Sequence, residues 1–356
     1  MRAAFLVGPS QLQVRETAEP VTPEDGLVLE VRACGVCGSD LRRWREGPAS
    51  PKPQRESGTT PFAVIPGHEI GGIVISTGRS VSAFREGDWL AVAPDVHCGR
   101  CFYCQRGLYN LCDDLLMIGI TPGCPGGLAE RLALTGRMLR DGIVHRLPQG
   151  VSFEEGALAE PLSSVVACHQ SLGTGLADTV VVIGAGPIGC MHIAVAKARG
   201  ARVIVSQRSE PRRTLAARFG PDLIVDPGSE DLATAVRDLT DGRGAEIAIC
   251  ANPVAETQRL AVELVRKGGR VVLFGGLPKA EPMVTLDANR IHYGEIQIWG
   301  AFSYHPTMHE LALDLLARKM VRAEDLITHR FALDDVQAAF ETAGSGVGLK
   351  TMVLPQ

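Results

Sequence analysis

A glycine-rich turn, Gly184-x-Gly186-x-x-Gly189, follows directly after an apolar run and precedes residues typical of a helix. A turn of this kind between a buried strand and a helix indicates a dinucleotide-binding site. Gly184 would permit the tight turn, Gly186 would let the backbone approach a pyrophosphate, and Gly189 would allow close helix packing. Pro187 and Ile188 would open the helix whose N-terminus faces the phosphates. A glycine turn in an α/β domain that binds no nucleotide is the alternative, which this context disfavours.

Alternation of strands and helices continues beyond this turn, with apolar strand-like runs at 202–206, 246–250 and 270–274. It predicts an α/β fold with a doubly wound parallel sheet, a Rossmann nucleotide-binding domain that we place at residues 158–289. Residues 1–157 contain short strands interrupted by Gly and Pro, which predicts an antiparallel, barrel-like β domain. Residues 290–356 do not extend the alternation, so we expect them to return to the first domain.

Charge and hydropathy exclude several classes of partner. Lys plus Arg number 36 and Asp plus Glu number 40, giving a net charge of −4, so no basic excess favours nucleic acid or an anionic membrane. The N-terminus lacks the pattern of a signal peptide, and no apolar run approaches the roughly 18 residues of a membrane-spanning helix. We therefore expect a cytoplasmic protein, in which clustered cysteines more often bind metal than form disulfides.

Four of the ten cysteines lie within a lobe at residues 97–113, and they are Cys98, Cys101, Cys104 and Cys112. Four thiolates at this spacing can surround one tetrahedral Zn²⁺ and leave no open position, which predicts a structural zinc site. An iron–sulfur cluster is the alternative. The ferredoxin run C-x2-C-x2-C-x3-C-P is not matched, because seven residues separate the last two cysteines.

A second, sparser group predicts a catalytic zinc. Cys37, His68, Glu69 and Glu160 offer one thiolate, one imidazole and two carboxylates. Such a mixed, incomplete shell leaves a position for water or substrate. Each residue taken singly is weak evidence, since a lone cysteine is usually a small buried hydrophobe.

The residues after the second predicted strand bear on the cofactor. An NAD site would place an acid there to accept the ribose 2′-hydroxyl, but the sequence is Ser206-Gln207-Arg208-Ser209. Arg208, together with Arg212 or Arg213, could instead pair with a 2′-phosphate. We therefore expect NADP(H) to be favoured over NAD(H). The alternative is that these arginines form only a solvated helix face.

Taken together and in this order, these motifs resemble the zinc-dependent medium-chain alcohol dehydrogenase family over essentially the whole chain. The sorbitol (polyol) dehydrogenase branch is the most similar, and the threonine dehydrogenase branch shares several of the motifs. The segments that carry the resemblance are 37–40, 67–69, 159–163, 328–331 and 346–350. The resemblance implies a GroES-like catalytic domain completed by the C-terminal segment, two zinc ions per chain, and a homo-oligomer, with a tetramer favoured.

Site roles also follow from the resemblance. It implies that Cys37 and His68 hold the catalytic zinc with a carboxylate, and it leaves open whether Glu69 or Glu160 is the direct ligand. Ser39 matches the hydroxyl that relays the alcohol proton. The chain departs from the family at Arg42, where a histidine is common; an arginine stays protonated and cannot act as a base near neutral pH.

Two further positions bear on the substrate. Ser303-Tyr304 stands where sorbitol dehydrogenases have an Arg-Tyr pair that contacts hydroxyls, so Tyr304 is a candidate substrate contact and sorbitol itself is in doubt. Arg42 belongs to a basic segment with Arg43, Arg45, Lys52 and Arg55. This segment would suit a phosphorylated or carboxylated substrate. The alternative is a solvated or subunit-contacting loop.

The sequence thus predicts a zinc-dependent NAD(P) dehydrogenase that interconverts a secondary hydroxyl of a polyol or cyclitol-like substrate and its ketone. A threonine-type 3-hydroxy amino acid dehydrogenase is one alternative. A zinc-binding scaffold of the same fold without turnover is another. Metal content separates an enzyme of either kind from such a scaffold, because the enzyme requires about two Zn²⁺ per chain and the scaffold about one.

Overall fold

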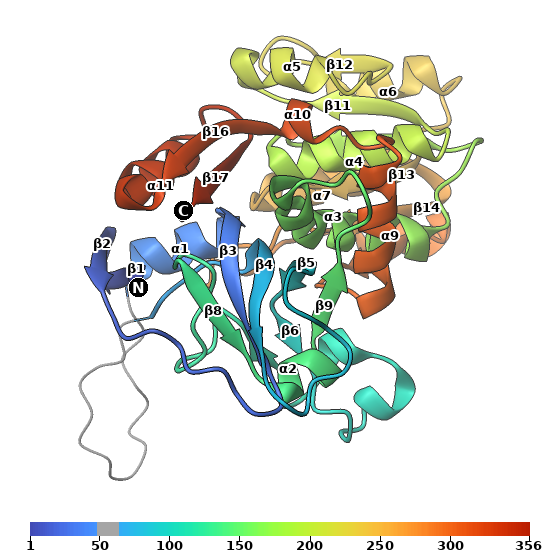
Figure 1. Ribbon diagram of the computed structural model, residues 1–356. Helices are drawn as coiled ribbons and strands as arrows, with labels where there is room; N and C mark the ends of the chain where they lie inside the picture. The colour runs from blue at the N-terminus through green and yellow to red at the C-terminus, as the bar shows by residue number, and fades with distance from the viewer. Residues whose placement is uncertain (48–63) are drawn as a thin grey trace. The chain divides into compact units, whose positions relative to one another are not determined.

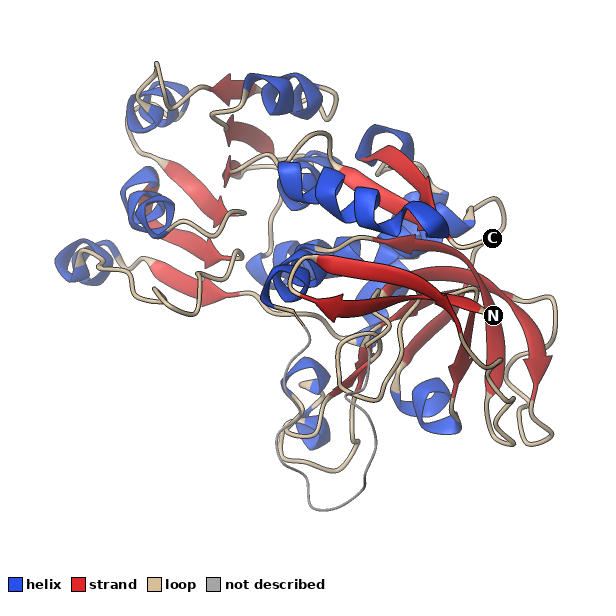
Figure 2. Ribbon diagram, turned by 90° about the vertical axis from the view of Figure 1, so that its left-hand side faces the viewer, coloured by secondary structure: helices blue, strands red, loops and turns tan. Residues whose placement is uncertain are grey.

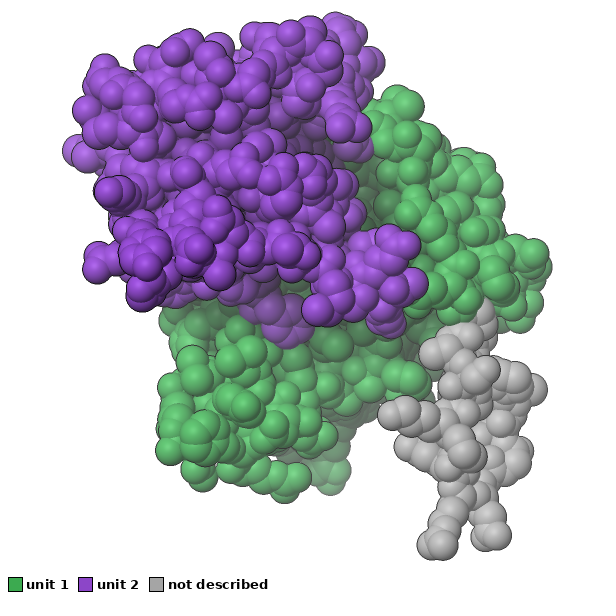
Figure 3. Space-filling model, turned by 180° about the vertical axis from the view of Figure 1, so that it is seen from behind, with its two compact units in different colours: residues 1–163, 304–319, 327–356 green, residues 164–303, 320–326 purple. Residues whose placement is uncertain are grey.

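The computed structural model describes residues 1–47 and 64–356 and divides into two compact units (Figures 1 and 3). Unit 1 comprises Met1–Ser163, Tyr304–Lys319 and Ile327–Gln356. Unit 2 comprises Ser164–Ser303 and Met320–Leu326. Each unit contains its own cluster of buried apolar side chains.

Unit 2 is built on a six-stranded parallel sheet, in the order β12-β11-β10-β13-β14-β15. The strands are β10 (Thr179–Ile183), β11 (Arg202–Ser206), β12 (Leu223–Val225), β13 (Ala245–Cys250), β14 (Val265–Leu273) and β15 (Gln297–Gly300). The helices are α4 (Pro187–Ala198), α5 (Glu210–Ala217), α6 (Leu232–Leu239), α7 (Ala255–Leu264), α8 (Ala288–Gly294) and α10 (Ala323–Leu326). Strand β10 is wholly buried, because apolar side chains occupy both of its faces. The expectation of a doubly wound parallel sheet is confirmed.

Unit 1 contains a seven-stranded sheet in the order β16-β17-β3-β4-β5-β9, with β8 also pairing with β3. Its strands are β3 (Leu27–Gly35), β4 (Glu69–Thr77), β5 (Trp89–Ala93), β8 (Arg131–Leu134), β9 (Ile143–Arg146), β16 (Ile327–Ala332) and β17 (Lys350–Leu354). Except for β16 with β17, the pairings are antiparallel. Figure 2 shows these strands curving rather than lying flat. This is the expected barrel-like β domain.

Shorter elements complete unit 1. Strands β1 (Arg2–Gly8) and β2 (Gln11–Glu16) form a hairpin, and β6 (Asp95–Val96) pairs with β7 (Leu116–Met117). The helices are α1 (Gly38–Glu46), α2 (Gly136–Asp141), α9 (Pro306–Ala317) and α11 (Val336–Ser345), and α3 (Phe153–Leu172) continues from unit 1 into unit 2. Within the described part of the chain, none of these helices meets the length and hydropathy of a membrane span.

The C-terminal segment returns to the first unit, as the sequence predicts, because β17 pairs antiparallel with β3 through Met352 opposite Gly35. The position of this return differs from the expected boundary at residue 290. Strand β15 pairs in parallel with β14 and β12 pairs in parallel with β11, so the parallel sheet has two more strands than the four that the alternation predicted. Unit 1 therefore resumes only at Tyr304.

Candidate active site

The four-cysteine lobe brings its sulfur atoms within 4.8 Å of one another. Backbone N–H groups point at these sulfurs, with Cys98 N 3.3 Å from Cys112 Sγ and Cys104 N 3.5 Å from Cys101 Sγ. Donation by Cys104 N is the main cause that lowers the pKa of Cys101 to about 6. Burial instead raises the pKa of Cys112 to about 12, so the assignment rests on the closed set of four sulfurs, which suits a structural Zn²⁺.

A second potential metal-binding group is formed by Cys37, His68 and Glu69, whose ligand atoms also lie within 4.8 Å of one another. The register of the β3–β4 pair explains their proximity, since Gly35 stands opposite Glu69. Cys37 follows the end of β3 and caps helix α1, while His68 immediately precedes β4. Three protein ligands leave a coordination position open, as a catalytic zinc requires.

The orientation of His68 is set by Asp40, a residue to which the sequence reasoning gave no role. Asp40 Oδ1 lies 3.2 Å from His68 Nδ1, and Asp40 Oδ2 accepts a hydrogen bond from Cys37 N at 3.1 Å. Burial acts to raise the pKa of Asp40, but the interactions with His68 and Cys37 outweigh it, so the pKa is lowered. A carboxylate behind a histidine leaves the opposite ring nitrogen for a metal. The sequence contained a signal for this role of Asp40, because this acid lies only three residues after the proposed ligand Cys37.

Ser39 lies on the other side of the histidine ring, with its Oγ 3.3 Å from His68 Nε2. Both Ser39 and Arg42 are exposed on helix α1, and their separation of three residues places them on the same helix face. Arg43 instead donates to Gly119 O at 3.2 Å, and Arg45 donates to Gly344 O at 3.3 Å. Within the basic segment, Lys52 and Arg55 fall outside the described residues.

Glu69 is fully buried and is held by a residue that the sequence reasoning missed. Lys350 Nζ donates to Glu69 Oε1 and, at 3.0 Å, to Val36 O. Glu69 Oε2 has no hydrogen-bond partner within residues 1–47 and 64–356. A Cβ added at Gly35 would lie 1.9 Å from this oxygen, so the backbone there is closely fitted to the carboxylate. A buried carboxylate oxygen without a partner, beside a thiol and an imidazole, fits a metal ligand.

Glu160 lies on helix α3 and does not belong to the compact three-ligand group in the described structure. Its Oε1 accepts a hydrogen bond from the Tyr304 hydroxyl at 3.1 Å. Burial is the main cause that raises the pKa of Glu160 to about 7; the charge of His68 opposes this rise and that of Glu69 adds to it. Glu160 therefore lies close enough to the group to interact electrostatically with it.

The glycine-rich turn joins β10 to α4 in unit 2. Gly184 has φ of +99°, which L-residues rarely adopt, and a Cβ at Gly189 would lie 1.9 Å from Gly184 O. Gly186 is the N-cap of α4, and Pro187 and Ile188 form its first turn. The free N–H groups of this turn form a suitable site for a phosphate.

The arginines near this turn differ in their surroundings. Arg213 donates to Gln207 O at 3.0 Å and also pairs with Asp226 at 3.0 Å, so its guanidinium is already engaged. Arg208 is exposed. A Cβ at Gly186 would lie 3.7 Å from Arg212 Nη1, which places the Arg212 guanidinium next to the turn.

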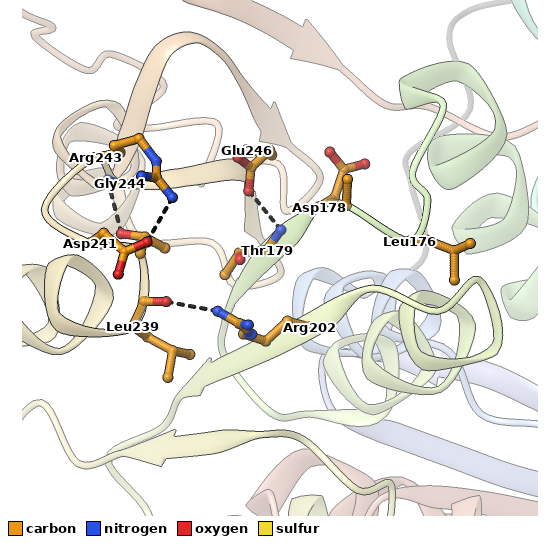
Figure 4. Close-up of a pocket in the computed structure, with 11 residues that line it drawn as sticks. Leu176, Asp178, Thr179, Arg202, Leu239, Asp241, Arg243, Gly244 and Glu246 are labelled. Atoms are coloured by element: carbon orange, nitrogen blue, oxygen red, sulfur yellow. Dashed lines mark hydrogen bonds and ion pairs between the residues drawn. The ribbon is translucent and has the colours of Figure 1, made fainter.

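Unit 2 also contains a cavity of about 220 Å³ (Figure 4). It is lined by Thr179 and Arg202, which are the first residues of β10 and β11. Dinucleotides bind at the opposite, carboxyl ends of such strands. The polar groups of the cavity largely bond to one another, as Arg243 does to Asp241 at 2.9 Å.

A dinucleotide-binding fold, a closed four-cysteine site and an open Cys-His-Glu site together define a zinc-dependent dehydrogenase. Comparison with known proteins agrees. The family model "Alcohol dehydrogenase GroES-like domain" matches residues 23–149, and the model "Zinc-binding dehydrogenase" matches residues 187–318. The chain belongs to the zinc-containing medium-chain dehydrogenase family, and it is an NAD(P)-dependent enzyme of the alcohol or polyol dehydrogenase kind.

The relatives match over the full length. Sorbitol dehydrogenase of Bacillus subtilis (strain 168) is 33% identical over 362 residues, covering 100% of this chain and 97% of the relative. D-arabitol-phosphate dehydrogenase of Enterococcus avium is 31% identical over 350 residues, covering 97% and 94%. A zinc-binding dehydrogenase structure from Sinorhizobium meliloti 1021 bound to NADP has a TM-score of 0.89 at 30% identity, covering 99% of each chain.

Proposed function

We propose that the protein interconverts a secondary hydroxyl of a polyol or cyclitol-like substrate and the corresponding ketone. The observation that carries this proposal is the open group of Cys37, His68 and Glu69, with Glu160 beside it and the Ser39 hydroxyl against the histidine ring. Relatives named sorbitol dehydrogenase and D-xylulose reductase support a polyol as the substrate class.

Zinc, when bound, would act as a Lewis acid that polarises the substrate oxygen, and the nicotinamide cofactor would supply or accept the hydride. Cys37, His68 and Glu69 would hold the metal, while Glu160 contributes a further carboxylate next to it. Asp40 keeps the His68 ring in one orientation. In the oxidative direction, Ser39 Oγ accepts the proton of the alcohol and passes its own to solvent, to which it is exposed. Arg42 cannot take that proton, because it remains protonated.

NADP(H) is the proposed preferred cofactor. The position after β11 that would hold an acid in an NAD site is Gln207, whose Oε1 accepts a hydrogen bond from Ala185 N at 2.8 Å. Arg208, which is exposed, and Arg212, which lies next to the glycine-rich turn, are the proposed contacts of a 2′-phosphate. Arg213 holds the loop through its bonds to two carbonyls and Asp226.

An anionic substrate such as a polyol phosphate is a second candidate. Arg42 supports it, because this exposed guanidinium lies one helical turn from Ser39, while Arg43 and Arg45 are bonded to carbonyls. A relative named D-arabitol-phosphate dehydrogenase adds support. The alternative is that Arg42 belongs only to a solvated or subunit-contacting segment.

Self-association is also proposed, with a tetramer favoured. All four residues of the edge strand β15 are exposed, including Ile298 and Trp299 at 37% and 39%. An exposed edge strand with large apolar side chains favours pairing with another chain. Light scattering coupled to size exclusion would measure the mass, and a monomer would contradict this proposal.

Nicotinamide absorbance with a panel of polyols, cyclitols, their phosphates, simple secondary alcohols and threonine tests the proposed function. NAD and NADP are run in parallel on protein with zinc content measured beforehand. Turnover confined to neutral or phosphorylated polyols supports the proposal. Turnover of threonine alone would replace it with a 3-hydroxy amino acid dehydrogenase.

A further inference from the structure

Tyr304 is a buried side chain whose hydroxyl is directed at a carboxylate. It is 3% exposed, and its OH lies 3.1 Å from Glu160 Oε1. A buried phenol needs a hydrogen-bond partner, and a carboxylate that accepts from it is restrained in turn. The substrate contact predicted for Tyr304 from the sequence stays a prediction beside this observed hydrogen bond.

The backbone on both sides of Tyr304 is specifically arranged. Ser303 has φ of +51°, in the left-handed region that non-glycine residues rarely adopt. His305 caps helix α9, its ring accepting a hydrogen bond from Thr307 N at 3.3 Å. A strained residue before Tyr304 and a capped helix after it limit the directions that the phenol can take.

Glu160 thereby differs from the neighbouring carboxylate, Glu69. Glu69 accepts from the charged Lys350 amine and keeps an unpartnered oxygen within the three-ligand group. Glu160 accepts from a neutral hydroxyl and remains outside that group, although its carboxylate interacts electrostatically with both His68 and Glu69. Glu69 in β4 is therefore held by the Lys350 ammonium, and Glu160 in α3 is held by the Tyr304 hydroxyl.

We propose that Tyr304 is a positioning residue for the catalytic metal site, its hydroxyl holding Glu160 beside the group of Cys37, His68 and Glu69. This inference rests on the proposed function only in taking that group as the zinc site. Without the hydroxyl, the Glu160 carboxylate loses its donor and is free to rotate toward or away from the metal. The environment of the metal then changes even when no substrate is present.

The test uses full-length protein in which Co²⁺ replaces the catalytic zinc, so that the visible spectrum reports the metal's coordination. Tyr304→Phe removes only the hydroxyl. We expect a shifted Co²⁺ spectrum in the absence of substrate and about tenfold weaker metal retention against a chelator, as found when groups behind metal ligands are removed. Tyr293→Phe, which removes the hydroxyl of a tyrosine that is 75% exposed in unit 2, should change neither quantity.

A second comparison, made in a Glu160→Gln variant, tests whether the effect of Tyr304→Phe acts through Glu160. In Glu160→Gln protein, adding Tyr304→Phe should produce little further change in spectrum or retention, because the two residues act through one hydrogen bond. An unchanged spectrum and retention in Tyr304→Phe, whether with a raised substrate KM or with only a lower melting temperature, would overturn the proposal. The spectrum needs no substrate, so this outcome is separable from a failure to find polyol turnover.

Discussion

Lys350, in the last strand of the chain, donates a hydrogen bond to Glu69, which lies 281 residues earlier. Both side chains are buried, so the ammonium and the carboxylate compensate each other where water cannot. The pair also ties the C-terminal strand β17 to the residues that carry the candidate metal ligands.

Replacing Lys350 by Met should destabilise metal-free protein by about 3–5 kcal/mol, since the carboxylate of Glu69 is left buried without a counter-charge. Bound zinc would compensate part of that charge, so the loss should be smaller in metal-loaded protein. Urea unfolding with and without a chelator measures both values. Lys197→Met is the matched control, because its exposed pair with Asp222 should contribute at most about 1 kcal/mol. Equal losses in the two lysine variants would contradict the prediction.

Cys98→Ser should reduce the zinc content by one ion per chain, because it removes one of the four sulfurs of the lobe. The remaining zinc should stay at the Cys37 group, and Cys37→Ser should remove that ion instead. Cys168→Ala is the control, since Cys168 is buried outside both groups. Elemental analysis after dialysis counts the ions. Retention of both zincs in Cys98→Ser would refute the assignment.

Arg208→Ala and Arg212→Ala should each lower kcat/KM for NADP by about tenfold or more, the equivalent of one charge-assisted hydrogen bond of ~1.5–3 kcal/mol. Values for NAD should change little, because NAD lacks the 2′-phosphate. Arg218→Ala, at the end of the same helix α5, serves as control. A preference of the unmodified enzyme for NAD would refute the proposed cofactor choice at the outset.

Arg42→Ala tests whether this residue binds an anionic substrate or belongs only to a solvated segment. If Arg42 binds the substrate anion, KM for a polyol phosphate should rise about tenfold or more, while the values for the neutral polyol stay constant. Unchanged KM values for both substrates would contradict the anionic-substrate proposal and leave Arg42 as a solvated residue of helix α1. Initial rates with both substrates and both cofactors distinguish these results.

Acidification should destabilise the protein through two pairs of histidines, in which His169, His192 and His309 are buried and His145 is partly exposed. His169 and His192 lie 3.1 Å apart between ring nitrogens, and His145 and His309 lie 2.9 Å apart. Burial is the main cause that lowers the pKa of His169 and of His309 to about 3. Below about pH 6.5 these histidines bind protons in the unfolded chain but stay neutral in the folded chain. The free energy of unfolding therefore falls as the pH decreases from there toward 3.

The expected loss by pH 5 is about 2 kcal/mol for each such histidine. Urea midpoints measured at several pH values check it, and His309→Gln should flatten the dependence. His292→Gln, at an exposed position of α8, should leave it unchanged. A dependence on pH that is the same in His309→Gln as in the unmodified protein would contradict this account.

The parallel sheet was predictable because its signal is local. Five consecutive buried residues in β10, the turn at Gly184 and the helix after it follow one another directly along the chain. Residues 295–299 are strand-like in the sequence, but the alternation did not place them in this sheet, and all four residues of β15 are exposed at its edge without a buried pattern. Burial, and therefore hydropathy, is least informative at such an edge.

The candidate zinc sites also combine features that the local sequence predicts with features that only the tertiary structure shows. Spacing along the chain determined that the four lobe cysteines could meet, because they lie 3 to 14 positions apart and a short loop can close around one ion. The sequence also marked Cys37, His68 and both glutamates as candidates. Only the tertiary structure distinguished the two glutamates, by placing Lys350 against Glu69 and Tyr304 against Glu160. These partners lie 281 and 144 residues apart, and strand register and helix packing, rather than any local pattern, bring them together.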